Sequence, residues 1–248
     1  MEEEGLIPSD APLSEVFEQA YAVLVDSYPA EYVGLNEAVC REMRASGPIQ
    51  VIRELAILGC KADLSVFTPG HSVGIEVKSR FDRLERLPMQ LRSYQEAFSE
   101  TWVVAAPQHA QRVLAESPLS VGVHVLSGPD LEEVRPARES IDLVQHQALF
   151  SLLRKPEYLR LIQERFGGCP EAPSTRIYRA CLAQFQRIDI SEAMDLVSGA
   201  IWDRGSALEA IQRQASRLPR PLRALAMTAN LVPSDLIRLA QIIESEPR

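Results

Sequence analysis

The sequence has 248 residues, of which 46% are hydrophobic and 24% charged, and its formal net charge at pH 7 is −8. This composition is typical of a globular protein and excludes wholesale disorder. Apolar runs such as 21–25 and 102–106 are too short to span a bilayer, and the acidic start M-E-E-E is unlike a signal peptide. Four scattered cysteines lack the spacing of a zinc site. We therefore expect a cytoplasmic protein with no membrane contact.

In chain order, the first half predicts two helices and then strands interrupted by helices. Apolar residues at helical spacing predict helices over 16–24 and 35–45. Strand patterns and flanking turn residues predict strands over 49–58, 61–67, 73–78, 102–106 and 121–126. Two predicted helices separate the later strands. One carries Gln90, and the other covers 108–116. Because an antiparallel hairpin is here joined to a crossover helix, we expect a mixed sheet.

The second half predicts helices only. Residues 128–140 are rich in charge and contain Pro129 and Pro136, which suits a linker. Helices over 177–186 and 191–203 follow, but the second is too acidic to suit a DNA major groove, so packing of a helical region is the favoured interpretation. Arginines at positions 213, 217, 220 and 223 are candidate contacts to a phosphate backbone, or equally a solvated helical face.

Asp63, Glu76 and Lys78 carry the most informative pattern in the chain. Successive side chains of a strand point to opposite faces, so Glu76 and Lys78 share one face and the hairpin turn T-P-G-H brings Asp63 beside Glu76. Two carboxylates can hold a hard divalent cation through oxygen, and a lysine can orient water or offset developing negative charge. The alternative is a solvated strand face with an incidental salt bridge.

The helix that follows adds two polar residues to this pattern. Pro88 suits the first turn of a helix, and the same segment carries an apolar stripe at helical spacing: Leu87, Leu91, Tyr94 and Phe98. Gln90 and Tyr94 are four residues apart and therefore neighbours on one helix face. Gln90 falls on the flank of the stripe, where its amide can reach the edge of the sheet and the proposed site.

The series Asp63, Glu76-x-Lys78 and then a helix with Gln90-x-x-x-Tyr94 resembles the PD-(D/E)XK nuclease superfamily in its RecB-type variant. The run from Glu76 to Gln90 is also similar to an uncharacterised bacterial family of nuclease-like proteins with the signature E-I-K-S…D-x-L-x-R-L-x-x-Q. The resemblance is strong over 49–114 and weaker beyond. Ala62 stands where the superfamily's name-giving proline is expected.

This resemblance implies a fold and a set of roles. The fold is α/β, with a mixed-sheet, restriction-endonuclease-like core of order αβββαβ within residues 1–139 and an all-helical region over 140–248. Asp63 and Glu76, aided by Glu54 and the Val77 carbonyl, are expected to bind Mg²⁺ or Mn²⁺. Lys78 is the expected catalytic lysine, and Gln90 and Tyr94 are expected to organise the site and its substrate.

Basic residues gather next to these positions although residues 1–150 are acidic overall. Their proximity predicts a rim that contacts nucleic acid, made of Ser79, Arg80, Arg83, Arg86, Arg92 and Tyr94. The alternative is a helix surface laced with ion pairs to Asp82 and Glu85. The overall acidity predicts weak binding that depends on metal and salt.

Together these observations predict a divalent-metal-dependent nuclease that acts on DNA, with RNA left open. One alternative is a catalytically silent nuclease-fold protein that binds nucleic acid or a protein partner. Another is that the helical region 140–248 docks a partner protein or a second copy of the chain. The sequence contains no P-loop, nucleotide-binding glycine turn or nucleophile elbow that would favour a different chemistry.

Overall fold

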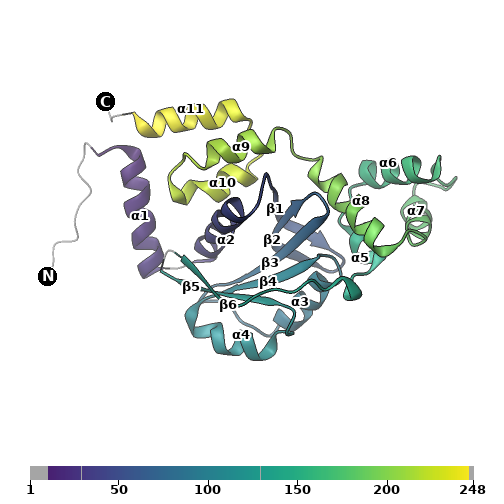
Figure 1. The fold of residues 1–248 in the computed structure, drawn as a ribbon, viewed down its shortest axis with the longest axis horizontal. Helices are drawn as coiled ribbons and strands as arrows, with labels where there is room; N and C mark the ends of the chain where they lie inside the picture. The colour runs from purple at the N-terminus through teal and green to yellow at the C-terminus, as the bar shows by residue number, and fades with distance from the viewer. Residues whose placement is uncertain (1–10, 29, 129, 246–248) are drawn as a thin grey trace.

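A computed structural model describes residues 11–28, 30–128 and 130–245. The start M-E-E-E and Pro129 lie outside the described residues. The described chain is a mixed α/β structure in which a six-stranded sheet is covered by helices on both faces (Figure 1). Its helical second half is as predicted. None of the helices in the described ranges is long and apolar enough to cross a membrane.

The strands follow one another across the sheet in sequence order, from β1 to β6. The pairs β1–β2, β2–β3 and β5–β6 are antiparallel, whereas β3–β4 and β4–β5 are parallel, so the predicted mixed sheet is confirmed. Gly70, at φ 75°, closes the turn between β2 and β3. The strands are β1 (Gln50–Ile57), β2 (Cys60–Thr68), β3 (His71–Lys78), β4 (Glu100–Ala105), β5 (Gly122–Ser127) and β6 (Asp130–Arg135).

Helices α1–α4 come before or between the strands in the chain, and α5–α11 all come after the last strand. The α-helices are α1 (Leu13–Ser27), α2 (Glu31–Ala45), α3 (Leu87–Gln95), α4 (Ala110–Glu116), α5 (His146–Ser151), α6 (Lys155–Phe166), α7 (Ile177–Phe185), α8 (Ile190–Trp202), α9 (Leu208–Ala215), α10 (Arg223–Thr228) and α11 (Pro233–Glu244). Short 3₁₀ turns are η1 (Pro107–His109), η2 (Ile141–Leu143) and η3 (Arg220–Leu222).

The linker prediction for 128–140 is wrong in its first part, because this stretch contains β6. Leu131 pairs with Leu126 and is partly buried against the core, while the neighbouring Glu132 and Glu133 are exposed. Charged side chains are common on an edge strand, where they discourage pairing with another chain. Because of these glutamates, the composition of β6 is that of a loop, and the sequence did not indicate a strand.

The two faces of the sheet bury different sets of side chains. On one face, Leu64, Ile75 and Val77 pack with residues of α2. On the other face, Phe67 and Gly74 meet α3 and the segment that follows it, where Tyr94 and Phe98 are fully buried. The candidate site lies on this second face, since Asp63 and Glu76 have the same strand parity as Phe67 and Gly74.

The helices after residue 140 contribute to both of these layers. Helices α5–α8 form a group whose Phe150 and Phe185 share a core with Phe67 and Tyr94 of the sheet and α3. Helices α9–α11 gather beside α1 and α2, at a distance from the first group (Figure 1). Residues from α9–α11 pack with Val51 and Ile75. A division of the chain at 139/140 therefore does not coincide with a division of the hydrophobic core.

A network of polar contacts connects the segment that begins α10 to α2. The buried carboxylate of Glu37 accepts hydrogen bonds from Tyr21 Oη at 2.7 Å and from Arg220 Nε at 3.0 Å. Asn36 Oδ1 accepts from the backbone N–H of Ala224 at 3.1 Å. Buried polar groups need such partners, so the start of α10 is held at one position along α2.

Replacing Gly74 with alanine will destabilise the protein, because a Cβ atom built there lies 2.3 Å from Cδ2 of the buried Phe98 ring. Overfilling a packed core costs about 1–3 kcal/mol, so we expect a lower melting temperature by circular dichroism. Gly199→Ala is the matched control, since a Cβ atom in that part of α8 meets nothing within 4 Å. Equal destabilisation by the two substitutions would contradict the packing of Phe98 on β3.

Candidate active site

The hairpin of β2 and β3 brings the two predicted carboxylates together. Leu64 pairs with Ile75 in the antiparallel register, which sets Asp63 across from Glu76. Both side chains project from the sheet face that α3 covers. Glu76 is 1% exposed and Lys78 is 7% exposed, so these charges lie in the interior and not on a solvated strand face.

Asp63 lies one residue beyond the last pair of the β2–β3 ladder, Leu64 and Ile75. Its Oδ2 accepts a hydrogen bond of 2.8 Å from the backbone N–H of Val77. Burial, and after it the negative charge of Glu76, raise the pKa of Asp63 to about 7, against the opposing effects of the Val77 N–H and of Lys78. A positive charge placed between the two carboxylates would relieve this repulsion.

Glu76 is held by donors from two elements. Lys78 Nζ donates to Glu76 Oε1 at 2.5 Å, and the Tyr94 hydroxyl of α3 lies within hydrogen-bond distance of Glu76 Oε2 and 2.9 Å from the Lys61 carbonyl oxygen. The phenol has one proton, which it can donate to either acceptor. Burial and the charge of Glu76 raise the pKa of Tyr94, so the phenol remains a protonated donor.

Gln90 reaches the lysine from the first turns of α3. Its Oε1 accepts a hydrogen bond of 3.2 Å from Lys78 Nζ. Pro88 lies at the start of this helix, as the sequence predicts. The ammonium group of Lys78 therefore has two fixed acceptors, Glu76 on its own strand and Gln90 on the helix above, and its position is determined by both.

Glu54 lies across from Asp63 in the register of β1 and β2 but does not join the buried cluster. Its carboxylate pairs with the exposed Lys61 ammonium at 3.2 Å. The residue has φ 51°, a value that is uncommon for a side chain larger than glycine. Glu54 also lines a groove of about 560 Å³ between the outer edge of β1 and the end of α10.

The buried donors fit a hard divalent cation. An ionised carboxylate has about four lone-pair positions, more than the single bond from Val77 to Asp63 uses. The N–H and C=O of one strand residue point to the same side, so the Val77 carbonyl is directed toward Asp63. Across the described ranges, no three His, Cys, Asp or Glu side chains come together as a metal-binding group. Mg²⁺, however, is commonly held by one or two carboxylates, completed by water and substrate phosphates.

The arginines of the predicted rim are exposed, whereas Ser79 and Tyr94 are buried, so the expected contact of these two side chains with nucleic acid is wrong. Ser79 is buried, and its N–H and hydroxyl both donate to Asp82 Oδ2, at 2.8 and 2.6 Å. Asp82 therefore stabilises the turn after β3. Arg83, Arg86 and Arg92 are exposed, and within the described chain no ion pair joins them to a carboxylate. The alternative of a surface laced with ion pairs is not what the structure contains.

Arg80 has two aromatic neighbours in space. Its guanidinium carbon lies 4.7 Å from the ring centroid of Phe81 and 5.6 Å from that of Tyr28. The two rings are 4.9 Å apart. Phe81 is an apolar residue inside the charged run R-F-D-R, and this pattern indicates an aromatic side chain exposed at the surface. The approach of Tyr28 depends on tertiary structure.

The second set of arginines makes contacts within the protein. Arg213 pairs with Glu209 and Arg217 bonds Gln214. Arg220 bonds Glu37 and Asp130, and Arg223 Nε donates to the Leu218 carbonyl. These contacts favour a structural role for the four residues over a role in binding a phosphate backbone.

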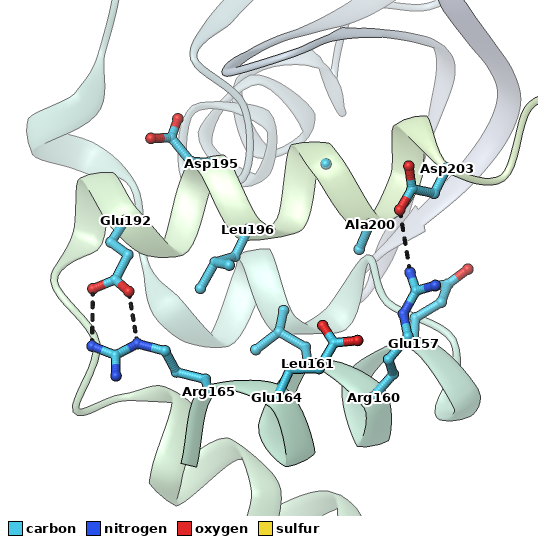
Figure 2. A pocket seen from close by; sticks show the side chains of 11 residues that line it. Glu157, Arg160, Leu161, Glu164, Arg165, Glu192, Asp195, Leu196, Ala200 and Asp203 are labelled. Atoms are coloured by element: carbon cyan, nitrogen blue, oxygen red, sulfur yellow. Dashed lines mark hydrogen bonds and ion pairs between the residues drawn. The ribbon is translucent and has the colours of Figure 1, made fainter. Parts of the chain in front are cut away.

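A groove between α6 and α8 lies apart from the buried cluster (Figure 2). Its volume is about 550 Å³, and Leu161, Leu196 and Ala200 line it between charged side chains. Figure 2 shows Arg165 turned toward Glu192 and Arg160 toward Asp203, pairs of 2.7 and 3.5 Å. None of the predicted catalytic residues lines this groove, since those residues lie on β2, β3 and α3.

Comparison with known proteins gives one family. Residues 35–216 match the model of the family described as bacteriophage P4 protein cII. No curated protein matches the chain. One solved structure, the SPO1766 protein of unknown function from Silicibacter pomeroyi, is 27% identical over 42% of this chain and 70% of its own, with a TM-score of 0.34. The family match spans most of the sequence, including β2, β3 and α3, and the chain therefore belongs to the bacteriophage P4 protein cII family.

Proposed function

We propose that this protein is a cytoplasmic, divalent-metal-dependent nuclease that hydrolyses phosphodiester bonds in DNA. The observation that carries the proposal is the convergence of Asp63, Glu76 and Lys78 on one buried face, with Gln90 bonded to the lysine. The element order from α2 through β1, β2, β3, α3 and β4 supports a restriction-endonuclease-like core. The PD-(D/E)XK resemblance of the sequence concerns these same elements.

Each residue of the cluster has a role that follows from its contacts. Lys78 orients the attacking water and offsets the charge that develops on the phosphate, as a fixed ammonium group can. Gln90 and Glu76 hold Lys78 Nζ in place, and Tyr94 fixes the carboxylate of Glu76. Mg²⁺ or Mn²⁺, held by Asp63, Glu76 and the Val77 carbonyl, would supply further charge stabilisation and lower the pKa of a bound water.

Burial of the lysine–carboxylate pair is the main argument against a purely structural role. Taking two charges out of water is expensive, and apolar residues of similar volume often stabilise a core at least as well. Strongly perturbed pKa values cluster at functional sites, where burial and neighbouring charges adjust a group for its chemistry. The raised pKa of Asp63 beside this pair fits that pattern.

A nuclease-fold protein without activity is the second candidate, and the position of Glu54 favours it. An accessory carboxylate paired with Lys61 at the surface is not available to a cation in the core. Isothermal titration of Mn²⁺ separates the two candidates. Binding that is lost in both Asp63→Asn and Glu76→Gln supports the nuclease, and heat that is unchanged in both variants supports the silent protein.

Lys78→Ala will lower the rate of DNA cleavage in Mg²⁺ or Mn²⁺ by at least ~100-fold, because a positioned proton-transfer or charge-offsetting group contributes that much or more. Lys155→Ala is the matched control, since Lys155 is exposed at the start of α6. The assay follows a labelled oligonucleotide, with the rate expressed per folded molecule.

Loss of Lys78 also leaves Glu76 buried with one partner fewer, so the melting temperature will fall as well. Lys78→Arg keeps the positive charge but replaces the compact ammonium with a planar guanidinium. We therefore expect this variant to fold and to cleave DNA more slowly than the unmodified protein. Cleavage by either variant at the rate of the unmodified protein would show that the activity does not arise from this site.

Gln90→Ala will reduce cleavage by ~100-fold while the melting temperature stays within experimental error, because a small misplacement of a catalytic group is costly to rate. Gln90 is half-buried and its side-chain bond is to Lys78. Gln90→Glu keeps an acceptor for the ammonium and should restore part of the rate. Gln111→Ala, on the exposed surface of α4, is the control. If Gln90→Ala changes stability but not turnover, Gln90 only completes the core boundary.

A further inference from the structure

Two exposed aromatic rings form a surface feature that packing does not explain. Phe81 is 55% exposed and Tyr28 is 51% exposed. Their centroids are 4.9 Å apart with the ring planes inclined by 35°. The Arg80 guanidinium lies over both rings. We call Tyr28, Arg80 and Phe81 the aromatic platform.

The aromatic platform includes two residues of the turn that follows the candidate active-site strand β3. Phe81 follows Lys78 by three residues, so their Cα atoms are separated by no more than about 11 Å of extended chain. The turn between them is fixed at two points. Asp82 accepts hydrogen bonds from Ser79, and Gln108 Nε2 donates to the Arg80 carbonyl at 2.8 Å. The turn that carries Arg80 and Phe81 is therefore fixed relative to Lys78, and Tyr28 packs against Phe81 of that turn.

Aromatic rings beside a phosphodiester site have a specific use. Each nucleobase has a π-face that can stack on an aromatic side chain or on an arginine plane. A base inside a duplex is already stacked on its neighbours, so such a surface selects unpaired bases. Stacking also supplies affinity that does not depend on a strongly basic surface, and this chain has a net charge of −8.

We propose that Tyr28, Phe81 and Arg80 stack an unpaired nucleobase beside the scissile phosphate, so that the substrate is single-stranded nucleic acid or a duplex with an unpaired end. This inference rests on the proposed nuclease function for the position of the phosphate. Arg83 and Arg86 follow on the same segment and are exposed, so they can contact the backbone of that strand.

Binding without cleavage tests the inference separately from the nuclease activity. The full-length protein is titrated, at low salt in the presence of Mg²⁺, into a single-stranded oligodeoxynucleotide that carries 2-aminopurine and hydrolysis-resistant phosphorothioate linkages, and into the same oligonucleotide as a blunt duplex. We expect quenching of 2-aminopurine in the single strand and weaker binding of the duplex. Phe81→Leu and Tyr28→Leu remove a ring and keep apolar volume, and each should weaken single-strand binding by ~10-fold.

Phe17→Leu is the matched control, because Phe17 is also an exposed aromatic residue, in α1. Melting temperatures of all three variants verify folding. If Phe81→Leu and Tyr28→Leu bind the single strand as the unmodified protein does, the inference is wrong and the rings serve another contact, such as a protein partner. An equal loss for single strand and duplex also contradicts it. Platform-dependent binding by a protein that cuts nothing would instead contradict the nuclease proposal alone.

Discussion

Glu76 and Lys78 place two opposite charges on the central strand β3, where almost no water reaches them. Removing both charges from water costs several kcal/mol per ion, and their attraction offsets this only when further hydrogen bonds complete the geometry. Tyr94 and Gln90 supply these bonds from α3. The position of α3 on the sheet is therefore tied to the ion pair, as is the direction of the lysine.

The surrounding layers keep this pair enclosed. Tyr94 and Phe98 are covered by Phe67 and, farther along the chain, by Phe150 and Phe185 of the α5–α8 group. On the opposite face α2 and α9–α11 fill the space over Ile75 and Val77. The helical second half of the chain is thus part of the packing that maintains the site. A low local dielectric strengthens every charge–charge contact inside it.

The sequence was informative where the relevant contacts are local. Strand alternation and a Pro-Gly turn were sufficient to place Asp63, Glu76 and Lys78 on one face, and helical spacing was sufficient to direct Gln90 to the same place. It failed for β6, whose glutamates have the composition of a loop. It also assigned the four C-terminal arginines no partners, because Glu37 and Asp130 reach Arg220 only through the tertiary fold. The approach of Tyr28 to Phe81 was invisible for the same reason.

The central claim is that the paired carboxylates of β2 and β3 bind a divalent cation within reach of Lys78. A crystal of the protein soaked in Mn²⁺, with anomalous diffraction measured to locate the ion, tests it most directly. We expect an anomalous peak between Asp63 and Glu76, within coordination distance of an oxygen of each and of the Val77 carbonyl. A fully soaked crystal with no peak there, or with Mn²⁺ bound only at other carboxylates, would contradict it.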